Sequence, residues 1–500
     1  MKRSKFNLSN HKLLSCDMGE LVPVGLTEVL PGDTIQQATT CLIRFAPLLA
    51  PPMHLVHIQI SHWFVPHRLV WEDWEDFITG GPDGMDNAVF PTITMPAVGG
   101  ASIGSLADYL GVPTGVNSLE VSALPFRAYA LIFNEWFRDQ DLQTPLVIDQ
   151  TSGPDTTTNT TLQRAAWEKD YFTTSRPWEQ KGPSITIPLG TSAPVGGLGL
   201  QGSGGTWTNT TATRGVTAAQ DWTGSGSNSA QMQNIGSEFT IRTTGTGGSR
   251  RPDIYADLSS ASAITINLLR EAFALQRFEE ARARFGSRYV EYLRYLGVRS
   301  SDARLQRPEF LGGGRYPIQF SEVLQTAEGS DPVGTLRGHG IGVARSNRYR
   351  RFFEEHGYVV SLITVKPKTI YMQGLPRTWN RRTKEDFFQT ELQHIGQQEV
   401  LNKEVYAAHA SPNGTFGFQD RYDEYRRVES TIAGEFRTTL DFWHFGRQFS
   451  GAPALNASFV ECVPSEQPFA VPSTDVLYVM ARHSMQARRI VAPVGTSYIY

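Results

Sequence analysis

The sequence contains few cysteines, no long apolar run and almost no net charge. Its three cysteines, Cys16, Cys41 and Cys462, are odd in number and show no C-x-x-C spacing. This pattern argues against a disulfide framework and a structural zinc site, and favours assembly in a reducing cytoplasm. No apolar run approaches the ~20 residues that a bilayer span needs, and the basic N-terminus lacks the apolar segment of a signal peptide. The net charge of −3 provides no global field for a polyanion, so any contact with nucleic acid must be local.

Motifs for catalysis and for nucleotide binding are also missing or misplaced. The sequence has no G-x-S-x-G, no H-E-x-x-H and no P-loop. Gly197, Gly199 and Gly202 form a G-x-G-x-x-G pattern, but the residues that follow, SGGTWTNTT, cannot start a helix. Because a dinucleotide fingerprint must open a helix, we predict no cofactor there.

Two clusters of polar residues suggest chemistry that the local geometry disfavours. His54, His57, His62 and His67 occur close together, but on a strand His54 and His62 would lie about 27 Å apart, too far to share a metal ion. The acids of residues 71–78 (WEDWEDFI) could supply the two carboxylates of a glycosidase. Acids on a short amphipathic helix more often form a solvated face, with Trp71 and Trp74 anchoring the turn to a sheet.

What the sequence has in abundance is turns and short apolar segments. It contains 46 glycines and 29 prolines, and 40% of its residues are hydrophobic. Strands are predicted at Ile35–Phe45, His54–Val65 and Tyr358–Val365. Short strands separated by glycine and proline predict a mainly β fold, an antiparallel β-sandwich such as an eight-stranded jelly roll. We expect residues 1–500 to form one such domain with long loop insertions, although this length would also fit several domains.

The strongest helical pattern lies at 266–297. Asn267 is a plausible N-cap, and Gly286 would end the first helix in a left-handed conformation. A second helix would end at Gly297, giving an antiparallel helix pair as a helical insertion. Shorter helices are expected at Leu106–Leu110 and Gln397–Tyr406.

Residues 190–250 differ in composition from the rest of the chain. They are rich in Gly, Thr, Ser and Asn, with Asp221 and Glu238 as the only acids. Loops this long inside a compact chain are usually functional or disordered. We expect a variable surface insertion, and its exposed contact candidates are Trp207, Arg214 and Trp222.

Two basic segments are candidates for contact with DNA. The first is residues 1–15, which are either a solvated tail or a basic arm that touches a neighbouring subunit or DNA phosphates. The second is RTWNRR at 377–382, either a surface loop or a cluster that stacks on and neutralises single-stranded DNA. The DNA-facing candidates are Lys2, Arg3, Lys5, Arg377, Trp379, Arg381 and Arg382.

A long segment around the predicted helices resembles a known family. LLREAFALQRFEEARARFGSRYVEYLRYLGVRSSDARLQRPEFLGGG is similar to the central signature of the major capsid protein of the Microviridae, small icosahedral single-stranded DNA phages, within their gokushovirus-like group. NEWFRDQ, FGFQDRYDEYRR and PALNASFV resemble further blocks of that family. In RPWEQKGP, Glu179 replaces a proline of the family's motif. The resemblance covers most of residues 25–460.

This resemblance implies a structural protein without a cofactor or a catalytic site. It implies sixty copies in a T=1 icosahedral shell around circular single-stranded DNA, with pentameric intermediates. The implied partners are internal scaffolding, pilot and small DNA-binding phage proteins and a host cell-surface receptor, with no membrane. The implied location is the virion, assembled in the host bacterial cytoplasm. By position, residues 190–250 correspond to an insertion implied to form threefold protrusions and to contact the host.

Aromatic residues are enriched in protein cores and interfaces, which suggests anchor positions. The core or interface anchor candidates are Trp136, Trp178, Arg307, Pro308 and Trp443. Two other functions stay open from the residues alone. One is a β-sandwich glycan-binding protein or depolymerase that uses the acids at 72–76, and the other is an adhesin that uses the Gly/Thr-rich loop.

Overall fold

The computed structural model describes residues 3–82, 85–183, 185, 266–285, 291, 294, 297, 306–326 and 332–493, together with short strands between residues 195 and 256. The chain divides into two compact units. The first comprises Met1–Lys181 and Glu280–Tyr500, and the second is Gly182–Glu279. The insertion predicted at 190–250 lies within the second unit.

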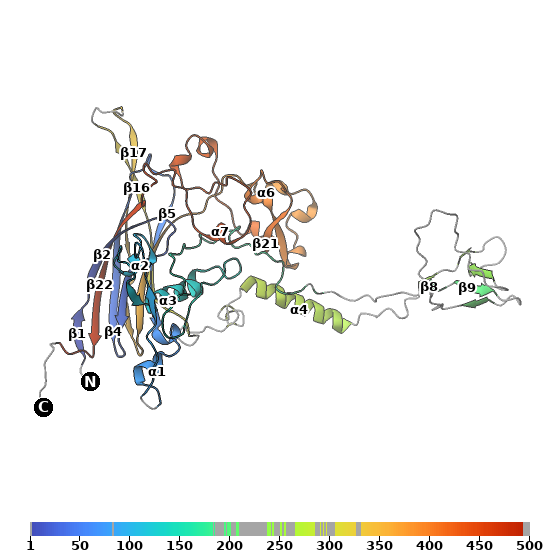
Figure 1. Ribbon diagram of the computed structural model, residues 1–500. Helices are drawn as coiled ribbons and strands as arrows, with labels where there is room; N and C mark the ends of the chain where they lie inside the picture. The colour runs from blue at the N-terminus through green and yellow to red at the C-terminus, as the bar shows by residue number, and fades with distance from the viewer. Residues whose placement is uncertain are drawn as a thin grey trace. The chain divides into compact units, whose positions relative to one another are not determined.

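A seven-stranded antiparallel sheet forms one layer of the first unit (Figure 1). Its order is β1-β22-β4-β17-β16, with β2 also paired to β22 and β18 also paired to β4. The strands are β1 (Ser4–Asn7), β2 (Asn10–Cys16), β4 (Thr34–Phe45), β16 (Gln319–Leu324), β17 (Leu336–Arg345), β18 (Tyr349–Phe352) and β22 (Leu477–Arg489). The segment predicted as a basic arm therefore supplies two strands, and β22, the last described strand, lies between them and β4.

Side chains of β22 alternate between buried and exposed from Leu477 to Arg488. Successive residues of a strand point to opposite faces of the sheet. Such alternation means that one face of the sheet packs against the core while the other meets solvent.

A four-stranded antiparallel sheet forms the second layer, in the order β15-β5-β19-β3. The strands are β3 (Val22–Val29), β5 (Val56–Pro66), β15 (Glu309–Pro317) and β19 (Gly357–Pro367). In β19 nearly every residue is buried, so this sheet is covered on both faces.

The main hydrophobic core lies between the two sheets. Ile43 and Val479 of the larger sheet belong to the same buried cluster as Ile58 and Ile363 of the smaller one. At Gly342 of β17 an added Cβ would lie 2.8 Å from Ile58 Cδ1, so this glycine allows the close approach of the sheets. Two antiparallel sheets enclosing one core confirm the prediction of a mainly β fold consistent with a β-sandwich.

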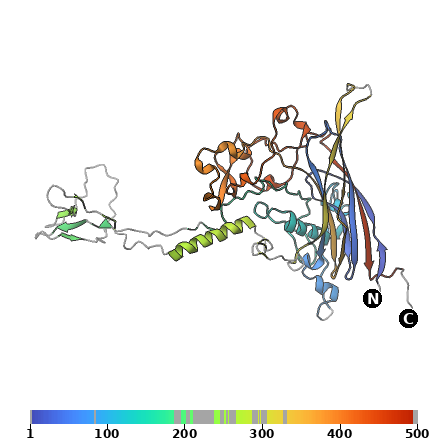
Figure 2. The ribbon, with the colours of Figure 1, turned by 180° about the vertical axis from the view of Figure 1, so that it is seen from behind.

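Helices cover the outer face of the four-stranded sheet (Figure 2). They are α1 (Trp74–Thr79), α2 (Leu106–Leu110) and α3 (Leu124–Ile132), and α3 continues as a π-helical turn at Phe133–Phe137. Trp71 is fully buried in this layer and its Nε1 donates to Ser152 Oγ at 2.8 Å, which confirms its predicted role as an anchor. Glu72 and Glu75, from the acidic cluster, are exposed.

The remaining elements are short. β6 (Thr92–Thr94) pairs with β7 (Glu120–Ser122), and β20 (Gln397–Leu401) pairs with β21 (Thr415–Asp420). Helices α6 (Asn402–Val405) and α7 (Ala457–Val460) are single turns, and 3-10 turns lie at His67–Leu69, Arg377–Asn380, Lys384–Asp386, Leu392–His394, Asp423–Tyr425, Gly434–Arg437 and Asp441–Trp443. The helix predicted at Gln397–Tyr406 is therefore wrong over its first half, which is a strand.

In the second unit the described strands pair with one another. β9 (Leu198–Gln201) lies between β10 (Trp207–Asn209) and β11 (Glu238–Ile241), β12 (Thr243–Thr244) pairs with β13 (Arg251–Pro252), and β8 (Val195–Gly196) pairs with β14 (Tyr255–Ala256).

Helix α4 (Ile266–Phe285) runs across the boundary between the units in sequence. It lies where the first helix of the pattern at 266–297 was predicted. Asn267 lies inside this helix rather than at its N-cap, so that detail is wrong. Most of the predicted second helix, and with it the pairing of the two helices, lies outside the described residues.

Candidate functional site

In the basic-aromatic cluster predicted to face DNA, Arg377 and Arg381 form ion pairs with carboxylates. Arg377 Nη1 lies 2.9 Å from Glu404 Oε1, and its Nε lies 3.7 Å from Glu424. Arg381 lies 3.4 Å from Glu424 Oε1 and stacks 4.4 Å from the Tyr425 ring. The charges of both guanidinium groups are thus largely offset by carboxylates of the same unit.

The other two members of this cluster face solvent. Trp379 is 69% exposed, and Arg382 is exposed while its Nη1 donates to the carbonyl of Trp379 at 3.1 Å. Of the cluster's three arginines, only Arg382 has a guanidinium without a carboxylate partner among the described residues, although its backbone amide donates to Asp386 Oδ2 at 2.7 Å.

Beside Arg377 lies a pocket of about 310 Å³. Its walls combine aromatic rings with carboxyl groups, including Tyr171, Phe172, Tyr371, Glu404 and Glu429. Glu404 is buried and Arg377 compensates its charge, yet burial still raises the pKa of Glu404. Burial, and the nearby Asp170 carboxylate, raise the pKa of Glu429 to about 7.

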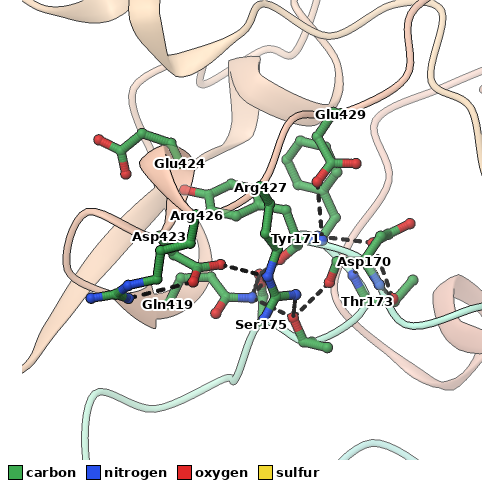
Figure 3. Close-up of polar contacts among 12 residues, drawn as sticks. Asp170, Tyr171, Thr173, Ser175, Gln419, Asp423, Glu424, Arg426, Arg427 and Glu429 are labelled. Carbon is green, nitrogen blue, oxygen red and sulfur yellow. Dashed lines mark hydrogen bonds and ion pairs between the residues drawn. The ribbon is translucent and has the colours of Figure 1, made fainter.

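The polar network at one side of this pocket joins two distant segments (Figure 3). Glu429 Oε1 accepts from the Tyr171 amide at 3.2 Å, and Gln419 Nε2 donates to the Tyr171 carbonyl. Asp170 Oδ1 accepts from the amide of Thr173 at 2.8 Å.

These bonds satisfy backbone groups and fix one loop against another. Of the carboxyl groups that line the pocket, Glu404 pairs with Arg377 and Glu429 accepts from the Tyr171 amide. In the part of the chain that the structure describes, no group of three or more His, Cys, Asp or Glu could hold a metal ion. His54 and His62 instead contact the Lys368 carbonyl and the Ser361 hydroxyl.

Three of the five anchor candidates come together in one place. Trp136 Nε1 donates to the Pro308 carbonyl at 3.0 Å, and the Arg307 guanidinium lies 4.1 Å from the Trp136 ring centroid. The ring of Trp63, in β5, also packs against Trp136, with the two ring centroids 4.7 Å apart. This group joins the π-helical turn after α3, β5 and the segment before β15 within the first unit.

The remaining anchor candidates are separate from that group. Trp178 is 38% exposed, with the Lys181 ammonium 5.1 Å from its ring. Trp443 is half-buried, and its carbonyl accepts from the Met53 amide.

Two predicted DNA-facing residues lie on the outer face of the seven-stranded sheet. Lys5 of β1 is exposed and lies opposite Arg488 of β22. Arg3 Nη1 donates to the Gly32 carbonyl at 2.9 Å and to Thr34 Oγ1 at 3.2 Å. Lys2 lies outside the described residues.

Sequence reasoning left the facing of Arg482 and Arg488 unassigned, and the structure places both on that same outer face. The sequence does contain a pattern that predicts this facing. From 477 to 487 every second residue is apolar except His483, which predicts a half-buried strand. The apolar residues are Leu477, Val479, Ala481, Met485 and Ala487.

Of the three host-contact candidates, Trp207 lies in β10 of the second unit. Arg214 and Trp222 lie outside the described residues. Among the described helices, none is both long enough and apolar enough to cross a membrane.

Comparisons with known proteins agree over nearly the whole chain. The model of the family described as "Capsid protein (F protein)" matches residues 1–497. "Capsid protein VP1" of Bdellovibrio phage phiMH2K is 39% identical, covering 95% of this chain and 90% of the relative. "Capsid protein VP1" of Chlamydia phage 1 is 34% identical over 94% of this chain and 91% of the relative. The protein of the same name from Spiroplasma virus 4 is 32% identical, over 92% and 87% respectively.

Proposed function

The chain belongs to the capsid protein (F protein) family, and from that membership we propose that it builds a closed T=1 icosahedral shell around circular single-stranded DNA. It is a structural capsid protein of a small single-stranded DNA phage and not an enzyme. The shell would contain sixty copies and form through pentameric intermediates. Its closed point-group symmetry would repeat each weak contact between copies around the particle.

The observation that carries this proposal is the match of the family model over residues 1–497. The fold supports it, since a β-sandwich with a rigid two-sheet core offers loops on several sides for contact with neighbouring copies. The finer assignment of the sandwich as an eight-stranded jelly roll belongs to the same proposal.

The partners and the location follow from assembly. We expect packaged single-stranded DNA inside, and internal scaffolding, pilot and small DNA-binding phage proteins during assembly in the host cytoplasm. The finished location is the virion. The second unit, which contains residues 190–250, is proposed to form protrusions at the threefold axes and to contact a host receptor.

Co-expression of the full chain with its scaffolding partner and single-stranded DNA tests this function. We expect closed particles of uniform size by electron microscopy and one fast-sedimenting species. A chain that folds and stays monomeric under every such condition would contradict the proposal.

A further inference from the structure

The outer face of the seven-stranded sheet carries many more positive than negative charges. Its exposed cations include Arg3 and Arg337, and six others that come from five of the strands: Lys5, Arg44, Arg345, Arg350, Arg482 and Arg488. The other outward positions of the seven strands, read from the alternation and the register, include no Asp or Glu. The carboxyl that reaches this face is Asp475 at its end, which accepts from Ser15 Oγ.

Strand register places these cations side by side. Arg482 and Arg345 both lie opposite Thr40, on either side of β4, which separates them by about 10 Å. Lys5 lies directly opposite Arg488. The cations therefore form a patch that extends across the sheet and along the strands rather than a single cluster.

These six side chains differ from most exposed arginines of the first unit. None of them makes a hydrogen bond or an ion pair with any residue that the structure describes. By contrast, Arg315 pairs with Glu168 at 3.1 Å and Arg351 pairs with Glu309 at 3.0 Å.

Adjacent residues show the contrast most directly. Arg350 points outward without a partner, whereas its neighbour Arg351 points toward the other sheet and has one. Arg488 and Arg489 repeat the pattern, since Arg489 lies 3.0 Å from Asp33. The unpaired charges are thus a property of one face and not of the strands.

No described element covers this face (Figures 1 and 2). The α3 helix and the C-terminal loops lie on the side of the four-stranded sheet, as the second core cluster also shows. Tyr478 and Phe352, each 47% exposed, stand on the same face as the cations.

We propose that this face binds the phosphate backbone of the packaged single-stranded DNA, with Tyr478 available for stacking on bases; the Phe352 ring already has the Arg3 guanidinium 5.4 Å from its centroid. This inference rests on the proposed function and assigns the surface that faces the genome. Unpaired arginines match phosphate groups in charge and hydrogen bonding, and exposed aromatics stack on bases without regard to sequence. The net charge of the whole chain is −3, so the attraction is local to this face.

Fluorescence anisotropy of the full chain with a labelled oligothymidylate, over a series of salt concentrations, tests the proposal. Six phosphate contacts give a slope of about −4 in log affinity against log salt, a loss of roughly 300-fold between about 50 and 200 mM. The variant Arg350→Gln/Arg482→Gln/Arg488→Gln should halve that slope, so that its affinity falls only about 20-fold over the same range. The matched Lys variant at these positions should keep the wild-type slope.

A second triple variant controls for loss of charge alone. Arg315→Gln/Arg351→Gln/Arg426→Gln removes three exposed arginines whose partners are carboxylates, and it should bind as the wild type does. Equal slopes for the two Gln variants would overturn the inference.

Particle formation, measured by electron microscopy on the same samples, separates this inference from the proposed function. Leu13, Val343 and Met480 form an exposed apolar row on the face, which a neighbouring copy could also cover. If the outer-face Gln variant loses assembly while its DNA affinity is unchanged, the face joins copies of the chain and the inference fails. If the wild type binds DNA with the expected slope but never closes into particles, the proposed function fails and the DNA surface stands.

Discussion

At the scale of single residues, the fold depends on a few polar groups that are fully withdrawn from water. The side chains of Arg127 and Asp155 are both 0% exposed, and Arg127 Nε lies 2.8 Å from Asp155 Oδ2. Arg127 also donates to the carbonyls of Val70 and Thr151. Removing one member of such a pair leaves the other charge buried without compensation.

We therefore expect Asp155→Asn to lower the free energy of unfolding by about 3–5 kcal/mol. Urea unfolding of the unassembled chain would measure this change. Lys169→Gln, which removes an ion pair with a half-exposed lysine, is the control and should cost at most about 1 kcal/mol. Similar losses in the two variants would contradict the argument.

A second residue-scale feature is a polar cluster between the sheets. His62 Nδ1 lies 2.8 Å from Ser361 Oγ, and His483 Nδ1 lies 2.8 Å from Thr39 Oγ1. Burial, and then the other histidine, lower the pKa of His62 to about 3. Burial also lowers the pKa of His483.

The sign of the pH dependence follows from these lowered pKa values. An unfolded histidine takes up a proton near pH 6.5, whereas buried His62 does not until about pH 3. The unfolded state binds more protons in this window, so stability falls as the pH drops from 6.5 toward 3, by up to about 1.4 kcal/mol per pH unit for each such histidine. Unfolding free energies of His62→Gln measured between pH 6.5 and 5 should have a shallower slope than those of the wild type. His11→Gln, at an exposed position, should keep the wild-type slope, and a wild-type slope in His62→Gln would refute the assignment.

At the scale of elements, local patterns predicted those strands and helices that are regular in sequence. β4, β5, β19, α2 and α4 lie where apolar periodicity placed them. Apart from Leu13, the outward residues of the N-terminal strands β1 and β2 are charged or polar, so their sequence alone suits a solvated arm. They are strands because β22, more than 450 residues away, offers them a free edge.

The contacts of the candidate site could not be predicted from local sequence patterns either. RTWNRR has the composition of a DNA-binding cluster, but composition does not reveal Glu404 and Glu424, which the fold brings to its arginines. Conversely, the outer-face cations are dispersed in sequence from Lys5 to Arg488. They meet only through long-range strand pairing, which no local pattern encodes.

The assignment of faces in β22 can be tested with two neighbouring residues. Val479 is 2% exposed and faces the core, whereas Met480 is 40% exposed and faces outward. Val479→Ala should lower the free energy of unfolding by about 2 kcal/mol through the lost burial and the cavity, and Met480→Ala by no more than about 0.5 kcal/mol. Thermal or urea unfolding of the two variants would compare them, and the opposite order would mean that the strand faces the other way.

At the scale of the whole molecule, the chain divides into two compact units. The sandwich, its helices and the C-terminal loops belong to the first unit, and Gly182–Glu279 forms the second. The described strands β8 to β14 pair only within that second unit. The two units can therefore carry different parts of the function.

From this division we expect a chain that lacks residues 195–245 to form closed particles, because β1–β5 and β15–β22 keep their strand partners. Attachment of those particles to the host should fall at least tenfold if the insertion contacts the receptor, which a cell-binding assay with labelled particles would measure. Val479→Asp, which places a carboxylate in the core between the sheets, should prevent assembly and shows that the particle assay can detect failure. If the shortened chain does not assemble, the insertion is part of the shell. If its particles attach like the wild type, the receptor contact lies outside residues 195–245.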